Sequence, residues 1–538
     1  MITQIPPDFI KAIAKEHRVT DAELETVFMA LDGVSTTAIA QQLEISDIAV
    51  RKRLGEVYKK FKITGNGPGK LAELKHQLLF LYQVTQNSPL GITPISLSSG
   101  AILRHQQDWA EAPEISVFYG RNQELETLQQ WIISENCPLV TLWGLPGIGK
   151  TTLGVKLANI LKEDFDLILW RSRRNPQSPD QFITHLIQTI IHHFPGKITT
   201  NSSDQLSELI ELLRHYKVFL IFDDWENVLK PKKLWGEYRE GYQDYGNLIK
   251  QIAQVNHKSC LLVISSEIPP ELSLLNGEKV RFIQPHVSAE IPLTLFQNKG
   301  LSASSKEWEI LINLYGGNLL SFQIISGKIA DFFNGNVLDF IEATDVFLDN
   351  PLTSLLLQQF QRLSPGEEEI IYWCVIENKP ISLSQLKANI LVKYPLSEFL
   401  NILDSLKARS LLEKQIENGE TLFTLQPLIR KSVTNLLVEK VAAEIQNLIK
   451  TETTESMLLL KSHRLLTENP EKDTKNTPKN HLGDLIKNHI EAILIKNTDY
   501  EKSRQTLTKI AESLVNKSPR EVRYARENIQ ILISELTH

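Results

Sequence analysis

Residues 138–162 read PLVTLWGLPGIGKTTLGVKLANILK, and this stretch decides the fold that the sequence predicts. An apolar run, PLVTLW, leads directly into Gly144, and a helical pattern follows the loop. The loop fits the pattern G-x-x-x-x-G-K-[ST], in which glycines let the backbone turn tightly and aim N–H groups at phosphate oxygens. The helix presents its N-terminal N–H donors and positive dipole end to the same anion. The stretch therefore predicts a strand, a phosphate-binding loop and a helix.

The loop supplies the first set of candidate site residues. Lys150 would reach the β- and γ-phosphates and serve catalysis, and the Thr151 hydroxyl would ligate Mg²⁺. The strand–loop–helix context argues against a chance match, which the bare pattern alone would give in about one or two chains per hundred of this length. We therefore expect an ATP/ADP site with Mg²⁺, and we assign nucleotide contacts to Gly144, Gly147, Ile148, Gly149, Lys150, Thr151 and Thr152.

A second apolar run, VFLIF, ends in Asp223 and Asp224. A carboxylate at the end of such a strand can hold the water shell of Mg²⁺, and its neighbour can orient or deprotonate an attacking water. We assign Asp223 to the metal and Asp224 to catalysis. The alternative is that the two acids are turn residues, which often end strands.

Short apolar runs alternate with helical patterns from Phe118 to about Pro285. The runs are PLVTLW, FDLILW, VFLIF and CLLVIS. Continuous apolar runs of this length fit strands that are buried on both faces, as in a parallel sheet covered by helices. The fold class is therefore multidomain, with an α/β nucleotide-binding domain between α-helical regions.

Composition excludes several classes of protein. The chain has 538 residues, of which 42% are apolar and 23% charged, so globular domains of ordinary composition are expected. Its three cysteines are sparse and lack metal-type spacing, which favours a reducing compartment. Since we find neither a signal peptide nor an apolar stretch of about 18 residues, we expect a cytoplasmic protein without a membrane span. The net charge of −6 identifies no partner.

The N-terminal region predicts a helix-turn-helix. A tight turn would separate two short helices, of which Ser46 caps the second, and the stretch around Val57–Phe61 is similar to LuxR-type DNA-binding domains. Basic residues on and after that helix could neutralise DNA phosphates. The same face could instead bind a protein partner or be solvated. The residues in question are Arg51, Lys52, Arg53, Lys59 and Lys60.

The region from Phe118 to Leu437 resembles an NB-ARC ATPase of the STAND class, the module of plant disease-resistance proteins and the apoptosome scaffold. Its opening motif, FYGRNQEL, implies that Arg121 flanks the adenine and ribose. YGGNLL at residues 315–320 resembles a motif of the small helical domain, and residues 363–427 resemble the winged helix. DWAEAP at residues 108–113 is similar to a cyanobacterial subgroup that often carries a WD-repeat propeller.

Three positions depart from the family pattern. Glu267 stands where relatives carry an Arg that senses the γ-phosphate, Leu319 replaces a nucleotide-facing Pro, and Gln426 lies near the place of a His that contacts ADP. A Glu would repel the terminal phosphate by roughly 4 kcal/mol at about 4 Å and an effective dielectric of 20. The hypothesis is weak preference for ATP, slow hydrolysis, or both; the alternative is tolerated drift.

The resemblance implies an ADP-bound resting state that exchange for ATP opens, with self-association in the ATP state. The rival hypotheses are a nucleotide-regulated transcription regulator and a catalytically dead scaffold. Because the sequence ends at His538, we expect no propeller, so the C-terminal helices or a separate protein would sense the signal. The expected divisions are a helix-turn-helix-like domain at 1–85, a linker at 86–117, the nucleotide-binding domain at 118–285, a small helical domain at 286–360, a winged helix at 361–440 and a helical region at 441–538.

Overall fold

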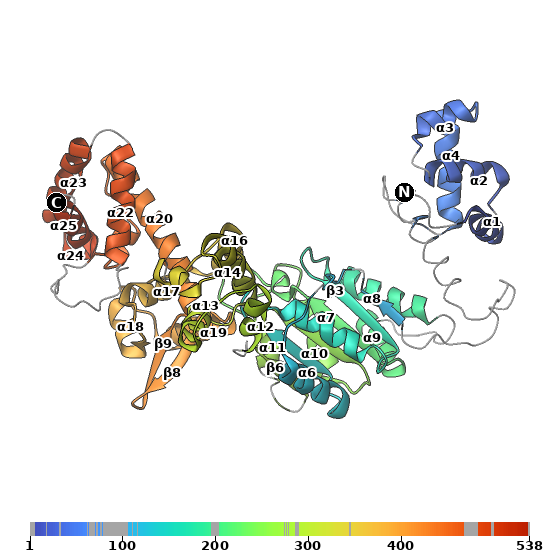
Figure 1. Cartoon of the computed structure of the whole chain (residues 1–538), viewed down its shortest axis with the longest axis horizontal. Coiled ribbons are helices and arrows are strands. Elements are labelled where there is room, and N and C mark those ends of the chain that lie inside the picture. Colours follow the sequence, from blue (N-terminus) through green and yellow to red (C-terminus); the bar gives the residue numbers. More distant parts are fainter. Residues whose placement is uncertain are drawn as a thin grey trace. The chain divides into compact units, whose positions relative to one another are not determined.

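The computed structural model divides into two compact units, Met1–Ile102 and Leu103–His538 (Figure 1). Three helix-rich regions accompany one large parallel sheet. The structure describes residues 6–61 except 18, 32 and 33; residues 63, 70, 71, 74, 75 and 78; residues 106–194 except 110 and 116; residues 204–285 except 274, 276 and 278; residues 290–466 except 344 and 345; and residues 482–496 and 500–535.

The first unit is built from short capped helices. Ser35 and Ser46 each accept a hydrogen bond from the backbone N–H three residues later, and so begin α3 and α4. Helix α4 packs against α2 and α3 through the fully buried side chains of Val50 and Val57. The helices are α1 (Pro7–Glu16), α2 (Asp21–Leu31), α3 (Thr36–Gln42) and α4 (Asp47–Lys60).

The second unit begins with a six-stranded sheet in which every described pairing is parallel. All four predicted apolar runs form strands of it, so the predicted parallel sheet is confirmed. In spatial order the strands are β1 (Gln106–Asp108), β3 (Leu167–Ser172), β4 (Val218–Asp223), β5 (Cys260–Ser265), β2 (Leu139–Trp143) and β6 (Val280–Ile283).

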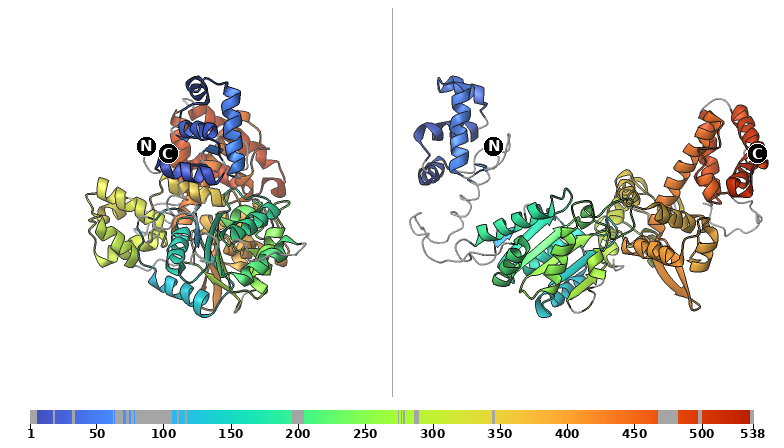
Figure 2. Two further views of the ribbon diagram at one scale, coloured as in Figure 1. Left: turned by 90° about the vertical axis from the view of Figure 1, so that its right-hand side faces the viewer. Right: turned by 180° about the vertical axis from the view of Figure 1, so that it is seen from behind.

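Helices cover both faces of this sheet (Figure 2). Along β4, Phe219 and Ile221 pack into one apolar cluster, and Leu220 and Phe222 pack into another, because successive side chains point to opposite faces. One face is covered by α6 (Asn122–Gln129), the π-helical turn η1 (Gln130–Ser134) and α7 (Lys150–Leu161), and the other by α8 (Pro179–His193), α9 (Gln205–His215) and α10 (Asp244–Gln254).

Strand β1 lies inside the predicted linker at residues 86–117. It pairs with β3 at the edge of the sheet, and Arg171 of β3 forms an ion pair of 2.7 Å with Asp108. Arg171 is buried, so the pair fixes β1 to the sheet. The nucleotide-binding fold therefore starts before Phe118, and the predicted linker was too long at this end. Residues 86–105 lie outside the described part of the chain.

Four helices follow the sheet and lead into a mixed region. The helices are α12 (Glu290–Asn298), α13 (Ser305–Tyr315), α14 (Leu319–Phe332) and α15 (Val337–Ala343). The mixed region holds α16 (Asn350–Phe360), α17 (Pro365–Glu377), α18 (Leu383–Asn389) and α19 (Leu396–Ala408), with an antiparallel sheet of β7 (Ile381–Ser382), β9 (Glu420–Thr424) and β8 (Glu413–Glu417).

Asn418 and Gly419, a dipeptide that is typical of two-residue hairpin turns, form such a turn here. Both residues have positive φ, 50° and 82°, and join β8 to β9 with Glu417 opposite Glu420. This is the backbone that Asn-Gly favours in two-residue turns.

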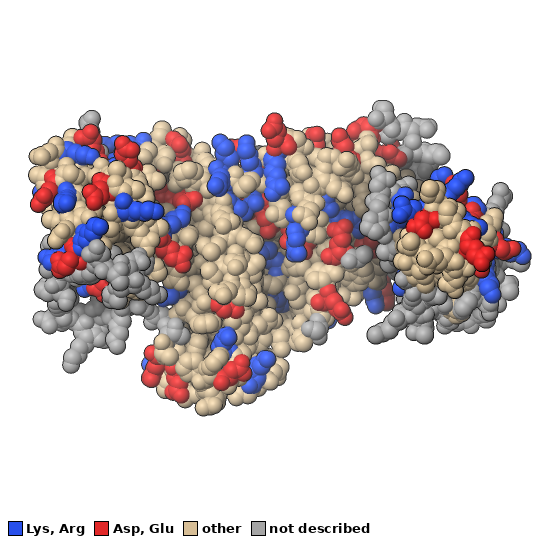
Figure 3. Space-filling model, turned by 90° about the horizontal axis from the view of Figure 1, so that it is seen from above, with Lys and Arg blue, Asp and Glu red and all other residues tan. Residues whose placement is uncertain are grey.

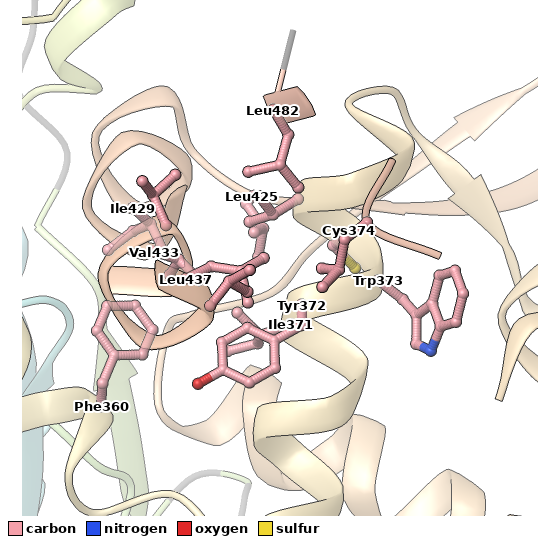
Figure 4. Close-up of a cluster of buried hydrophobic side chains, with 14 of the residues drawn as sticks. Phe360, Ile371, Tyr372, Trp373, Cys374, Leu425, Ile429, Val433, Leu437 and Leu482 are labelled. Carbon is pink, nitrogen blue, oxygen red and sulfur yellow. The ribbon is translucent and has the colours of Figure 1, made fainter. Parts of the chain in front are cut away.

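A long helix, α20 (Pro427–Thr451), connects the mixed region to the C-terminal helices. It packs on α17, and Ile371 and Cys374 of α17 meet Ile429 and Val433 of α20 in a buried cluster (Figure 4). The remaining elements include α21 (Leu459–Ser462), α22 (Leu482–Lys496), α23 (Tyr500–Val515), α24 (Pro519–Val522) and α25 (Ala525–Glu535). Residues 467–481 lie outside the described part of the chain.

The distribution of charge on the surface and the state of the cysteines fit the low net charge and the sparse cysteines of the sequence. On the face shown in Figure 3, basic and acidic residues are interspersed. Cys137, Cys260 and Cys374 are free and buried. Among the helices that the structure describes, none is long and apolar enough to span a bilayer.

Candidate functional site

The phosphate-binding loop lies between β2 and α7, at the carboxyl end of the sheet strands. Gly144, Gly147 and Gly149 have φ of 141°, 83° and 88°, values that L side chains rarely adopt. A Cβ at Gly144 would lie 2.5 Å from Ile148 Cδ1, so the loop closes tightly on its own buried Ile148. The loop geometry therefore requires the glycines that the motif places there.

Lys150 begins α7 and folds back over the loop. Its Nζ donates to the backbone oxygens of Gly144 at 2.7 Å and Leu145 at 3.0 Å. Burial lowers the pKa of Lys150, and the nearby charges of Glu226, Asp223 and Asp224 oppose this shift. The ammonium therefore lies among acceptors and carboxylates, where an anionic phosphate would compete for it.

Thr151 and Asp223 meet, as the assignment of both to a metal requires. The Thr151 hydroxyl donates to Asp223 Oδ1 at 3.3 Å. Burial, and then the charge of Asp224, raise the pKa of Asp223 to about 7, which a cation beside it would lower again. Among the described residues no group of three or more His, Cys, Asp or Glu could hold a metal ion. The hydroxyl–carboxylate pair nevertheless fits Mg²⁺, which keeps several waters and takes further oxygens from phosphate.

Asp224 follows in the left-handed region, with φ of 57°. Its Oδ2 accepts a hydrogen bond from Ser172 Oγ at 2.9 Å and lies 3.5 Å from Arg174 Nε, both at the end of β3. Burial and the charge of Glu226 raise the pKa of Asp224. A carboxylate whose pKa is raised in this way binds a proton more readily than a free aspartate, which is the property that a proton acceptor in catalysis requires.

Arg121, predicted from the opening motif, contacts the loop directly. Its guanidinium donates to the backbone oxygen of Ile148, and its side chain is buried. Its Nε and Nη1 are buried without a hydrogen-bond partner among the described residues. Buried guanidinium nitrogens normally have acceptors, so these two fit a bound nucleotide whose oxygens or ring nitrogens would satisfy them.

The start of α14 contacts the loop at Leu319, the position that the family motif assigns to a nucleotide-facing residue, but the contacts of its neighbours Asn318 and Leu320 were missed. Asn318 Nδ2 donates to Pro146 O at 2.9 Å, and Leu320 N donates to Gly147 O at 3.0 Å. Asn318 also caps α14, because its Oδ1 accepts from the N–H and hydroxyl of Ser321. The cap could have been predicted from Asn followed three residues later by Ser, but the contact with the loop could not.

Glu226 was also missed. Its Oε2 accepts hydrogen bonds from Ser265 Oγ at 3.2 Å and from Ser266 N at 3.1 Å. The residue belongs to a 3₁₀ turn, η2 (Trp225–Val228), directly after Asp223 and Asp224. Glu226 therefore joins the end of β4 to the end of β5, and its charge acts on Lys150.

The structure shows what each of the three residues that depart from the family pattern contacts. Leu319 lies on the loop, since a Cβ at Gly149 would be 3.0 Å from its Cδ1. Gln426 donates to Glu413 Oε1 at 2.6 Å and lies beside Gly316, two residues before Asn318. Glu267 is fully buried and forms ion pairs with Arg362 and Arg409. Two guanidinium groups thus compensate its charge, which removes the premise of the predicted repulsion.

The basic residues of α4 belong to the other unit and divide into two groups. Arg51, Lys52 and Lys59 are exposed, and Lys59 pairs with Glu56 at 2.8 Å. Arg53 instead donates to Ala22 O, and Lys60 pairs with Glu23 at 2.5 Å. Arg53 and Lys60 therefore contribute to packing between α2 and α4.

One known protein family matches the region that holds the site. Residues 121–252 match the family model of the NB-ARC domain. The matched range includes Arg121, the phosphate-binding loop and both aspartates. The match supports the assignment of this region to the P-loop nucleotide-binding ATPases, and the parallel sheet with its flanking helices agrees with that fold.

One sequence relative and two solved structures are similar to parts of this chain. An uncharacterized WD repeat-containing protein of Nostoc sp. is 37% identical over 359 residues, 63% of this chain, and the chain covers 28% of that protein's length. A Walker-type ATPase of Pyrococcus abyssi has a TM-score of 0.42 at 15% identity, covering 59% of this chain and 95% of its own. A STAND protein with a tetratricopeptide repeat sensor from Pyrococcus horikoshii has a TM-score of 0.33 at 18% identity, covering 80% of this chain and 60% of its own.

Proposed function

We propose that this chain is an ATP/ADP-controlled signal-transduction switch of the NB-ARC type. In the resting state ADP and Mg²⁺ occupy the loop between β2 and α7. Exchange for ATP rearranges the regions that follow the sheet, namely the small helical domain at 286–360 and the winged helix at 361–440. A switch of this kind acts in the cytoplasm, self-associates in the ATP state and answers to a sensor or effector protein.

The contact between α14 and the loop carries this proposal. Asn318 and Leu320 each donate to a backbone oxygen of the loop, at Pro146 and Gly147. A phosphate that turned the loop's N–H groups inward would also turn these peptide units, because each peptide unit is planar. Loading of the loop is therefore coupled by direct hydrogen bonds to the helix that starts the next region.

Slow hydrolysis of ATP is part of the proposal. Bound Mg²⁺ supplies charge stabilisation to the phosphates, and Thr151 with Asp223 would hold it. Lys150 would neutralise phosphate charge once it left the oxygens of Gly144 and Leu145. Asp224, held by Ser172, would take the proton of the attacking water.

Nucleotide binding and assembly test the proposal together. Calorimetry of the full chain with Mg²⁺ should show uptake of both ADP and a non-hydrolysable ATP analogue, and Lys150→Ala should abolish it. Glu135→Gln, which removes a surface ion pair with Arg281 in the same region, is the matched control and should bind normally. Size-exclusion chromatography should then show a larger species with the ATP analogue than with ADP. Protein that took up neither nucleotide would refute the switch.

One observation favours a second function, contact with duplex DNA through α4. Ile48, Arg51, Lys52, Gly55 and Lys59 recur at helical spacing, opposite the buried Val50 and Val57. Ile48 is 78% exposed, and a Cβ at Gly55 would meet nothing within 4 Å. This face carries cations, an exposed apolar side chain and room for close approach, which suits a helix in the major groove.

A mobility shift at several salt concentrations distinguishes DNA binding from a protein-binding role. The double variant Arg51→Ala/Lys52→Ala should weaken binding and lower the slope of log K against log salt by about two. Arg53→Ala, whose side chain packs on α2, should leave that slope unchanged. Absence of a shift at low salt would leave the protein-partner role. Nucleotide uptake without measurable turnover would favour the dead scaffold over the slow ATPase.

A further inference from the structure

A buried carboxylate at the end of β5 joins the sheet to the region that follows it. Glu267 Oε1 lies 2.5 Å from Arg362 Nε and 2.9 Å from Arg409 Nη1. Glu267 and Arg409 are both fully buried, and the Arg362 side chain is 12% exposed. Arg362 follows α16 and Arg409 follows α19, so both cations come from the region of residues 350–410.

A second carboxylate completes a neutral group of four charges. Arg409 Nε lies 3.1 Å from Glu367 Oε1, and the same oxygen accepts from Ser405 Oγ at 2.6 Å. Glu367 lies in the first turn of α17 and is fully buried. We call this group the charge cluster; its members are Glu267, Arg362, Glu367 and Arg409. Of these four residues, Glu267 alone belongs to the nucleotide-binding region.

Three backbone donors of the nucleotide-binding region surround the charge cluster. Lys232 N donates to Arg362 O at 2.8 Å, and Ile268 N donates to Ala408 O at 3.2 Å. Trp235 N donates to Ser405 Oγ at 2.7 Å. Each of these bonds has its acceptor in residues 350–410. Separation of the two regions would break all three, which makes these amides local reporters of the contact.

The charge cluster is connected to the candidate nucleotide site through Glu226. Its backbone oxygen accepts from Arg362 Nη2 at 2.7 Å, and its carboxylate holds Ser265 and Ser266, the residues directly before Glu267. Glu226 follows Asp224 by two positions and lies close enough to Lys150 for its charge to act there. A change around Lys150 therefore has a short physical route to Glu267.

We propose that Glu267 is the latch that holds residues 350–410 against the nucleotide-binding region, and that its release is the conformational step of the switch. The proposal rests on the proposed function. Opening would leave the Arg409–Glu367 pair together on one side and Glu267 without a partner on the other. A buried carboxylate without a charged partner is strongly unfavourable. A partly open contact, in which Glu267 has lost its arginines but is still shielded from water, is therefore disfavoured. The contact is either closed or open far enough for water to hydrate Glu267. Nucleotide bound beside Glu226 can shift this equilibrium by its differential affinity for the two states.

Hydrogen exchange on the full-length protein tests the latch. Glu267→Gln should accelerate exchange at the amides of Lys232, Trp235 and Ile268 by about tenfold or more, because the amide oxygen of Gln can still accept from the two guanidinium groups but lacks the negative charge that compensates them. Exchange within β4 should stay as in the wild type. Dissociation of bound ADP should accelerate by a similar factor. Wild-type exchange at the three amides would overturn the proposal.

Three further variants make the result decisive. If Glu267→Gln lost protection throughout the chain, Arg362→Gln would decide, since Arg409 still pairs with Glu267 there. This variant should accelerate exchange at Lys232 and Ile268, and unchanged exchange would overturn the latch. Glu135→Gln, the surface-pair control, should leave all three amides unchanged. Lys150→Ala in nucleotide-free protein should keep their protection, so failure of nucleotide binding and failure of the latch give different results.

Discussion

A side chain at Gly147 would clash with Asn318, and the free-energy cost of this clash can be worked out from the contacts of Asn318. The φ of Gly147 is 83°, and a Cβ there would lie 2.8 Å from Asn318 Oδ1 and 3.1 Å from both Asn318 Nδ2 and Leu320 Cβ. Asn318 cannot move away freely, because its side chain makes three hydrogen bonds, one to Pro146 O and two from Ser321. Gly147→Ala should therefore separate α14 from the loop.

The hairpin glycine provides the matched control. Gly419 has φ of 82°, and a Cβ there would meet nothing within 4 Å. Left-handed backbone costs a residue with a Cβ roughly 1–2 kcal/mol, and both alanine variants carry this strain. Gly147→Ala should cost a further amount of about 1.5–4.5 kcal/mol, if the three bonds of Asn318 are lost at about 0.5–1.5 kcal/mol each.

Local hydrogen exchange measures both costs, since a single unfolding free energy is not well defined for a chain of several domains. The Leu320 amide, which donates to Gly147 O, reports the loop contact. The amides of β8 and β9 report the hairpin. Gly147→Ala should also weaken ADP binding about tenfold or more, and Gly419→Ala should leave it unchanged. If protection fell equally in the two variants and ADP bound both normally, the contact between α14 and the loop would carry no energy.

Three further predictions concern other parts of the chain. Burial lowers the pKa of His463 to about 4, so the unfolded segment takes up the proton first, and the stability of the structure around His463 should fall between pH 6.5 and 4 by up to about 3 kcal/mol. The exchange protection of the amide of residue 463, which donates to Leu459 O, measures this decline after correction for the intrinsic pH dependence of exchange. His463→Gln should flatten the decline, and an equal slope would exclude His463 as its source. Asn528 makes four hydrogen bonds to backbone groups of residues 460–466. Asn528→Ala should therefore destabilise that contact by about 3 kcal/mol or more, measured by hydrogen exchange at the amides of Leu465 and Leu466. The exposed control Asn247→Ala should barely change this exchange. Arg121→Lys removes two buried donors and should weaken ADP binding about tenfold or more, and calorimetry that gave the wild-type Kd would show that Arg121 does not contact nucleotide.

The sequence predicted the features that depend on neighbouring residues. The runs of β2 to β5 are apolar because both faces of these strands are covered, and the loop glycines follow a fixed spacing. Asn418 and Gly419 determine their turn by their own backbone preferences. The placement of Thr151 beside Asp223 also followed from strand ends that meet at one edge of a parallel sheet.

Features that depend on distant residues were missed or misread. Strand β1 has the sequence QQD, without an apolar pattern, and its ion pair with Arg171 spans 63 positions. Asn318 meets Pro146 across 172 positions. Glu267 is the clearest case, since its partner Arg409 lies 142 positions away and reverses the electrostatic argument made from Glu267 alone. The residues that surround each of these positions in the sequence carry no information about partners so far away in the chain.

The edge position of β1 bears on how this protein can be divided for study. With β1 in place, the outer backbone groups in the first half of β3, from Leu167 to Leu169, are paired. A fragment that began at Phe118 would expose them as an open template, and unprotected sheet edges recruit strands from other molecules. Self-association of such a fragment would arise from the cut and imitate the assembly that nucleotide is expected to control. A fragment that began at Leu103 retains the three residues that shield β3.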